Sequence, residues 1–206
     1  MPQSTARLND RLRRQVAAEA ARILATEGQR NYGSAKNKAA TRLGVRDRAA
    51  LPSNREIEDE LKRYQALYGG DEHGQILTAL REAAVEAMEF FQRFRPRLVG
   101  PVLEGTADNH SRISLHLFCD TPEEVVSFLH QQRIAFEQET RRIRDHDGGA
   151  RTLELLVIEA GGQCFELALM IGPGGRAAPP DPVRGTPQRR AGIDEVRRLA
   201  AGQDYY

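Results

Sequence analysis

Apolar residues recur at intervals of three and four along the first half of the chain, which is the period of amphipathic α-helices. The pattern predicts helices over residues 8–27, 34–43, 54–68 and 72–95. Ser53 precedes the third of these helices, and Glu56 follows three positions later. This spacing predicts a capping box, in which each of the two side chains bonds a backbone N–H group at the start of the helix.

After Pro96 the period of the apolar residues changes from about 3.6 to 2, which is typical of strands. The pattern predicts strands over residues 98–104, 113–118, 134–139, 153–159 and 164–171. Gly161-Gly162 separates the last two strands and predicts an antiparallel hairpin. Thr121 and Pro122 mark the start of a helix that runs to about residue 131, and a last helix is expected over residues 193–201.

These elements predict an α+β fold, with an N-terminal helical half packed against a small mixed β-sheet. A chain of 206 residues accommodates one two-part domain or two small domains. We expect a helical region at 1–96, an α/β region at 97–172, and a Pro- and Gly-rich linker with a C-terminal helix at 173–206.

The composition predicts the cellular compartment in which the chain is found. It has no run of 18 apolar residues and no apolar segment near its N-terminus, so we expect a cytoplasmic protein without a membrane segment. Cys119 and Cys164 are then expected to be free thiols. Basic residues are almost all Arg, which is typical of a GC-rich bacterial genome. The oligomeric state does not follow from the sequence.

Charge is unevenly distributed along the chain. Residues 1–48 carry 11 basic and 4 acidic side chains, a net charge of +7, whereas residues 54–90 are acidic. Arg7, Arg11 and Arg14 form a basic stripe on the first helix. Such a stripe can be a solvated face, can dock against the acidic segment, or can bind the phosphates of a nucleic acid.

A strand, a turn of small residues, a second strand and a capped helix follow one another from Leu98 to His130. The turn is Gly105-Thr106, and the second strand begins in the segment Ser111-Arg112-Ile113-Ser114-Leu115. This order of elements and these residues resemble the nucleotidyltransferase superfamily of DNA polymerase β and the antibiotic nucleotidyltransferases. The resemblance implies a sheet of the nucleotidyltransferase type, with a turn that holds the phosphates of a nucleotide.

In that family, two carboxylates at alternate positions of the second strand and a third from a later strand hold two magnesium ions. Alternate positions suit this role because residues i and i+2 of a strand share one face. Arg112 and Ser114 occupy the positions of the two acids here, and an arginine repels a cation but attracts a phosphate. The resemblance therefore implies a protein that binds a nucleotide or another phosphate-bearing ligand and is catalytically inactive or altered.

The ligand-binding residues that the resemblance implies are Gly105, Thr106, Arg112, Ser114 and His116, with no metal ligand among them. His116 shares the strand face of Ser114, where it either lines the pocket or packs as an ordinary side chain.

Displaced acids offer an alternative route to a metal site. Asp108 and Asp120 lie near the two ends of the second strand, and Glu166 lies within the apolar run 164–171. Together they can supply oxygen ligands for magnesium if they converge. The sequence does not decide whether Glu166 faces solvent or is held in a site.

Two further segments carry charged or titratable side chains of functional interest. Arg184, Arg189 and Arg190 either reach back to a phosphate in the pocket of the sheet or belong to a mobile surface tail. Residues 145–147, Asp-His-Asp, precede two glycines and are expected to form a solvated loop.

A rival interpretation belongs to another functional class. In it the chain is a regulatory or interaction protein that binds nucleic acid or a protein partner through its basic N-terminal helices, and the sheet is only a scaffold.

Overall fold

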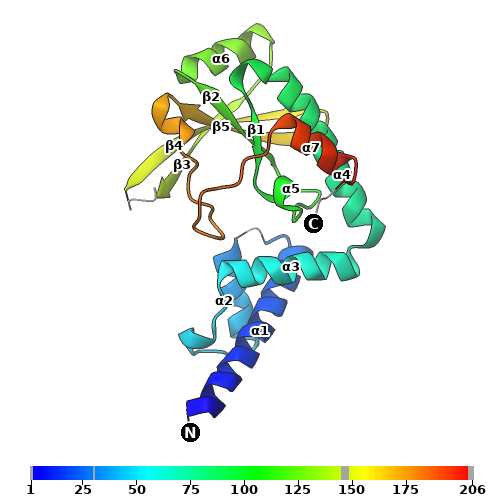
Figure 1. Cartoon of the computed structure of the whole chain (residues 1–206), viewed down its shortest axis with the longest axis vertical. Helices are drawn as coiled ribbons and strands as arrows, with labels where there is room; N and C mark the ends of the chain where they lie inside the picture. The colour runs from blue at the N-terminus through cyan, green and yellow to red at the C-terminus, as the bar shows by residue number, and fades with distance from the viewer. Residues whose placement is uncertain (1, 30, 145–148, 204–206) are drawn as a thin grey trace. The chain divides into compact units, whose positions relative to one another are not determined.

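The computed structural model describes residues 2–29, 31–144 and 149–203, so the loop expected at 145–147 lies outside the described residues. The chain forms two compact units, one up to His73 and one from Gly74 onward (Figure 1). The sequence marks a change of element type at Pro96, and the two units divide earlier, within a helix.

The helical unit is built from α1 (Pro2–Thr26), α2 (Tyr32–Arg42) and α3 (Asn54–Tyr68), with a 3₁₀ turn at Arg48–Ala50. Its core consists of small and branched apolar side chains that recur at helical spacing: Val16, Ala17, Ala20, Ala21, Ile23, Leu24, Ala35, Ala39, Ala40, Ile57 and Leu61. Alanines bring the helices close together, because they add little volume between the backbones. The helices expected in this part of the chain are confirmed.

The start of α3 shows the expected capping box. The Ser53 hydroxyl accepts a hydrogen bond from the Glu56 N–H at 3.2 Å, and the Glu56 carboxylate accepts one from the Ser53 N–H at 2.7 Å. Two backbone donors that the helix cannot satisfy by itself are therefore paired.

The second unit contains the sheet and the remaining helices, beginning with most of α4 (Gly70–Phe90) and a 3₁₀ turn at Gln92–Phe94. The elements that follow are β1 (Arg97–Val99), α5 (Pro101–Glu104), β2 (Ile113–Cys119), α6 (Pro122–Gln131), β3 (Glu137–Arg144), β4 (Ala150–Ala160), β5 (Gln163–Ile171), η3 (Pro173–Arg176) and α7 (Ile193–Ala200). In the described part of the chain, no helix has the length and apolar composition needed to cross a bilayer.

The strands form one sheet with the order β1-β2-β5-β4-β3, five strands within the residues described. β2 and β5 are parallel, and the other neighbours are antiparallel, so the sheet is mixed. Gly161 and Gly162 join β4 to β5 with φ values of 58° and 76°, which are the positive angles that a type I′ hairpin turn requires. An α+β fold with N-terminal helices followed by a mixed sheet is confirmed.

The two faces of the sheet differ in their surroundings. One face contributes alternate residues such as Ile113, Leu115 and Leu167 to the main core, where they pack with side chains of α4 and α6. The opposite face carries the intervening residues, among them Ser114, and we call it the Ser114 face. It has a small apolar cluster of its own, formed by Leu153, Leu155, Ala168 and Met170.

The first strand is shorter than the expected 98–104, and this expectation was wrong. β1 ends at Val99, because Gly100 has a positive φ of 73° and Pro101 starts the single helical turn α5. A glycine at positive φ breaks the extended conformation, and proline favours the first position of a helix. The third strand is also displaced, from 134–139 to Glu137–Arg144. It is an edge strand with few buried side chains, so its hydrophobic alternation is poor.

The C-terminal segment returns to the sheet. Leu98 of β1 and Ala191 exchange two backbone hydrogen bonds, of 3.0 and 2.9 Å. Ala191 and Val196 of α7 are fully buried. In Figure 1 the segment after η3 forms a long loop and then runs beside β1 before it enters α7.

Substitution of the capping residue should weaken the helical unit. Ser53→Ala removes one acceptor of the capping box and should lower the free energy of unfolding by about 1 kcal/mol. Thr121→Ala is the matched control, because Thr121 occupies the N-cap position of α6 without a side-chain capping bond. Urea unfolding, analysed for the unit that carries each substitution, measures the effect. Equal losses in the two variants would contradict the role of the capping box.

Candidate functional site

The Ser114 face has a polar end and an apolar end. On β2 it carries Ser114, His116 and Phe118, and their neighbours on the parallel strand β5 are Glu166, Ala168 and Met170. Ser114 lies directly beside Glu166, and Phe118 lies directly beside Met170. Cross-strand neighbours share one face of a sheet, so these six side chains form a continuous surface with His116 in the middle.

Glu166 is buried, with 6% of its surface exposed, and two arginines hold it. Arg141 of β3 donates to both carboxylate oxygens, with Nη1 at 2.9 Å from Oε1. Nη1 of Arg112 lies 3.6 Å from Oε2. The sequence left open whether Glu166 faces solvent or is held in a site, and the contacts show that it is held.

Arg112 joins Glu166 to the edge strand β3. Its guanidinium donates to both carboxylate oxygens of Glu139, at 3.0 and 3.1 Å. These hydrogen bonds, which Arg112 donates and Glu139 accepts, raise the pKa of Arg112 and lower the pKa of Glu139. Arg112, Glu139, Arg141 and Glu166 thus form a charge quartet in which two guanidinium groups neutralise two carboxylates.

The residues of this face do not fit a magnesium ion. The Arg112 guanidinium already lies between Glu139 and Glu166, and Ser114 supplies one neutral hydroxyl. Magnesium takes six oxygen ligands, usually one or two carboxylates together with waters and substrate phosphates. The two carboxylates near this point are already paired with guanidinium groups, whose positive charge repels a cation. Among the described residues, no group of three or more His, Cys, Asp or Glu side chains is arranged to hold a metal ion.

The other acids expected as metal ligands are Asp108 and Asp120. They lie far from Glu166 or accept hydrogen bonds within a turn. Asp108 accepts hydrogen bonds from the His110 N–H at 3.0 Å and from the Ser111 hydroxyl at 2.8 Å, so it stabilises the turn before β2. Asp120 is exposed and follows the last residue of β2. The length of β2 separates these two acids by about 20 Å, so they cannot share one ion.

The structure places Gly105 and Thr106 at the end of α5. Gly105 adopts the left-handed conformation, and Nη2 of Arg81 lies 3.7 Å from the position that a Cβ atom would occupy. The glycine beside Ser114 is Gly100, whose hypothetical Cβ lies 3.9 Å from the Ser114 hydroxyl. Gly100 was not expected at this position, because the apolar run predicts a strand that continues past it, although a Gly-Pro pair is itself a turn signal.

His116 is buried on the Ser114 face, with 2% of its surface exposed. Its Nδ1 accepts a hydrogen bond from Nε of Arg190 at 2.9 Å, so the ring proton lies on Nε2. Burial, and then the positive charges of Arg190 and Arg151, lower its pKa to about 3. His116 is therefore a neutral acceptor throughout the physiological range of pH.

Arg190 is the arginine of the C-terminal segment that reaches the sheet. Besides His116, its guanidinium contacts the Met170 sulfur at 3.2 Å and lies 5.1 Å from the centre of the Phe118 ring. Arg184 instead pairs with Glu104 of α5, and Arg189 pairs with Glu195 of α7. The tail thus has specific contacts, and only Arg190 among these three arginines is placed on the Ser114 face by them.

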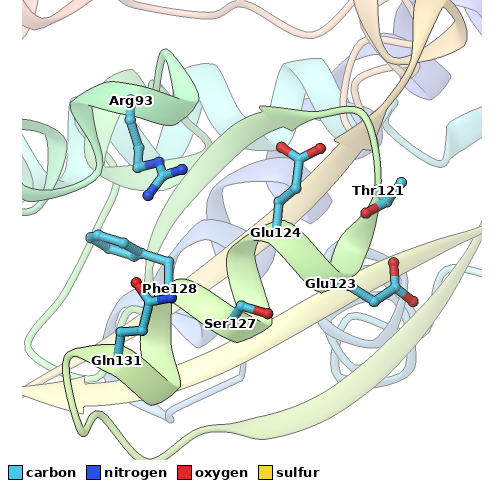
Figure 2. A pocket seen from close by; sticks show the side chains of 7 residues that line it. All are labelled: Arg93, Thr121, Glu123, Glu124, Ser127, Phe128 and Gln131. Atoms are coloured by element: carbon cyan, nitrogen blue, oxygen red, sulfur yellow. The ribbon is translucent and has the colours of Figure 1, made fainter.

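A separate hollow of about 320 Å³ lies over α6, on another part of the sheet unit (Figure 2). It is lined by Arg93, Thr121, Glu123, Glu124, Ser127, Phe128 and Gln131. The Arg93 guanidinium packs 5.5 Å from the centre of the Phe128 ring. None of the residues expected to bind the ligand lines this hollow, so it is distinct from the Ser114 face.

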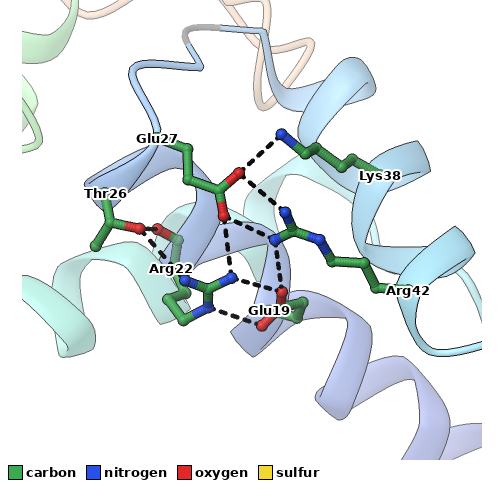
Figure 3. A network of polar contacts seen from close by, with 6 residues as sticks. All are labelled: Glu19, Arg22, Thr26, Glu27, Lys38 and Arg42. Carbon is green, nitrogen blue, oxygen red and sulfur yellow. Dashed lines mark hydrogen bonds and ion pairs between the residues drawn. The ribbon is translucent and has the colours of Figure 1, made fainter.

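Much of the basic charge in the helical unit is neutralised locally. Figure 3 shows Glu19 and Glu27 bound to Arg22, Lys38 and Arg42, which connects α1 to α2. Hydrogen bonds, first from Arg42 and then from Lys38, lower the pKa of Glu27 to about 2.

The basic stripe of α1 does not belong to this network. Arg7, Arg11 and Arg14 are exposed side chains of α1. Exposure is compatible both with a solvated face and with a nucleic-acid contact, so the binding role of the stripe stays a prediction.

Neutralising Glu166 should destabilise the sheet unit. Glu166→Gln leaves Arg112 and Arg141 without their buried countercharge, and we expect a loss of about 2 kcal/mol in the free energy of unfolding, because both arginines keep some access to water. Glu139→Gln is the matched control: it removes a partner of the same Arg112, but its side chain is 37% exposed, so the loss should be much smaller. Urea unfolding distinguishes the two, and an equal or larger loss in Glu139→Gln would contradict the burial argument.

His116 should not titrate in the folded protein between pH 5 and pH 8. Two-bond ¹H–¹⁵N spectra should show a neutral ring that is protonated on Nε2 throughout this range. Because the unfolded chain binds this proton below about pH 6.5 and the folded protein does not, His116 should lower stability as the pH falls from 6.5 toward 3. His116→Asn, which keeps an acceptor, should reduce this pH dependence. A His116 resonance that titrates near pH 6.5 would contradict the assignment.

Comparisons with known proteins found no match for this chain. No family model matches the sequence, no curated protein matches it, and no solved structure matches the fold. The chemistry of the Ser114 face and the motif at the start of β2 are therefore the features of this chain that bear on its function.

Proposed function

We propose that the chain is a nucleotidyltransferase-like protein that binds a nucleotide through its phosphates on the Ser114 face and does not carry out metal-dependent transfer. One observation carries this proposal. The guanidinium of Arg112 lies between Glu139 and Glu166. Arg112 directly precedes β2, at the position where the motif of that superfamily has a metal-binding acid.

The position of Glu166 supports kinship with that superfamily. The motif needs a third acid from a later strand beside the two acids of the second strand. Glu166 lies on the later strand β5, is paired in register with Ser114, and contacts Arg112. Burial of a carboxylate is costly unless it is paired. An acid that reached this position beside Ser114 by chance would therefore rarely be buried.

The replaced residues change the chemistry of the face. In a two-metal transfer reaction, the ions activate the attacking oxygen and stabilise the leaving oxygen. Neither Arg112 nor Ser114 can replace the two carboxylates that hold those ions, so we expect neither step to be catalysed. Arginines do, however, form strong charge-assisted hydrogen bonds with phosphate oxygens, so binding of the nucleotide does not need magnesium.

The backbone next to Ser114 suits a bound phosphate. Gly100 presents no side chain to the Ser114 hydroxyl, and Ser114 as a residue is half-buried. A ligand can therefore approach the main chain closely at this point. We therefore expect a phosphate of the ligand to lie at Gly100 and Ser114, five residues before the turn Gly105-Thr106 that the sequence indicates.

Thermal unfolding with nucleotides tests the proposal. At least one of ATP, CTP, GTP and UTP should stabilise the protein, by about 2.7 kcal/mol when its concentration is a hundred times Kd. Stabilisation should be the same or greater with EDTA than with magnesium, because magnesium neutralises part of the phosphate charge.

Two variants locate the effect on the Ser114 face. Ser114→Asp adds a negative charge beside Glu166 and should weaken nucleotide binding at least tenfold. Ser127→Asp, on exposed α6, adds the same charge elsewhere and should leave binding unchanged. If none of the four nucleotides stabilises the protein, the nucleotide site is refuted. Magnesium-dependent release of pyrophosphate would refute the absence of transfer.

A further inference from the structure

The two edges of the sheet differ in length and in cover. The β1 edge has three residues, and Ala191 of the C-terminal segment is bridged to Leu98 on it. The β3 edge has eight residues, and its inner neighbour is β4 (Figure 1). Within the described residues, no strand or isolated bridge pairs with the outer side of β3. Every second residue of β3 therefore directs its backbone N–H and C=O groups away from the sheet, where another strand can pair with them.

The charges of β3 are ordered along the strand. The acidic residues Glu137 and Glu139 precede Thr140, and the basic residues Arg141 and Arg142 follow it. The side chain of Arg141 is 51% exposed, and that of Glu139 is 37% exposed. Both keep access to a partner outside the chain, although each also belongs to the charge quartet. A strand with this order of charges is complementary to a second copy that runs in the opposite direction.

We infer that β3 is the interface of a symmetric dimer, in which the β3 strands of two copies pair in antiparallel fashion and join the two sheets into one. The two-fold axis passes through Thr140, which lies opposite Thr140 of the second copy. On each side of the axis, Glu139 faces Arg141 of the other copy, and Gln138 faces Arg142.

Symmetry and charge together select this register. A two-fold axis normal to the sheet keeps each side chain on its own face, so the axis has to pass through a residue and not between two residues. If the axis moves by one residue, either Glu139 or Arg141 lies opposite its own copy. Parallel pairing in register would oppose every charge with its like. Like charges directly opposite one another destabilise a pair of strands, so the axis at Thr140 is favoured.

The pairing extends the charge quartet across the axis. Glu139 and Arg141 lie on the Ser114 face, because they bind Arg112 and Glu166 there. In the dimer, Arg141 of the second copy lies beside Glu139, so that positive and negative groups alternate from one copy to the other. Edge strands commonly resist pairing through charges that repel, whereas in this register the charges of β3 attract.

The dimer goes beyond the proposed function and does not depend on nucleotide binding. Because the axis is normal to the sheet, the Ser114 faces of the two copies lie on the same side of the joined sheet.

Sedimentation velocity of the full-length chain tests the interface. It should show a reversible dimer whose fraction rises with concentration. Thr140→Lys places two positive charges opposite one another at the axis and should weaken the dimer by about tenfold or more. In the monomer the new lysine is paired in register with the exposed Glu154 of β4, so the sheet should keep its stability. Ser127→Lys, on the exposed side of α6, adds the same charge elsewhere and should dimerise as the unmodified chain does.

Disulfide cross-linking tests the register. Thr140→Cys brings two thiols to opposite positions at the axis, with Cβ atoms about 5 Å apart, so mild oxidation should yield a covalent dimer. Gln138→Cys is the matched control, because residue 138 is also exposed on β3. Its thiol would lie about 14 Å from that of the second copy, too far for a disulfide. The unmodified chain, with its free thiols Cys119 and Cys164, measures the background.

Each outcome supports or overturns the inference. A chain that stays monomeric at every concentration, or a dimer that Thr140→Lys leaves intact, would overturn the interface. Failure of Thr140→Cys to cross-link, or equal cross-linking of Gln138→Cys, would overturn the register. A monomeric chain that binds a nucleotide would refute the dimer and leave the proposed function in place. A dimer that binds no nucleotide would support the interface and refute the proposed function.

Discussion

A buried carboxylate has to be neutralised, and this requirement organises the sheet around Glu166. Arg141 approaches it from the edge strand and Arg112 from the start of β2, while Glu139 balances Arg112 in turn. These contacts connect β2, β3 and β5, although β3 is separated from β5 by β4. The contacts of this one carboxylate thereby connect the edge strand to the central strands. They also determine where the guanidinium groups lie on the Ser114 face.

The Ser114 face is divided into two electrostatic halves. At the Glu166 end, opposite charges compensate one another, and the local charge is close to zero. At the Phe118 end, the neutral ring of His116 accepts a hydrogen bond from the guanidinium of Arg190, which stacks over the Phe118 ring. The two halves meet at His116.

Local patterns were sufficient for most elements of the fold. The capping box at Ser53, the start of α6 at Pro122 and the Gly161-Gly162 hairpin each depend on residues that are close in sequence. Gly100 was misplaced because the apolar run continues past it, so hydrophobicity outweighed the turn signal. The partners of Arg112 and Arg190 lie 27 and 74 positions away. Such pairs depend on strand register and on the path of the tail, which local periodicity does not contain.

The bridge between Leu98 and Ala191 has a consequence for how the molecule is assembled. During synthesis, the five strands described for the sheet precede the segment that supplies Ala191 and Arg190. A nascent chain that ends after β5 therefore has these five strands, but lacks both the backbone partner of β1 and the arginine that stacks over Phe118. The contacts of Arg190 on the Ser114 face therefore form only after the segment that follows β5 has also left the ribosome.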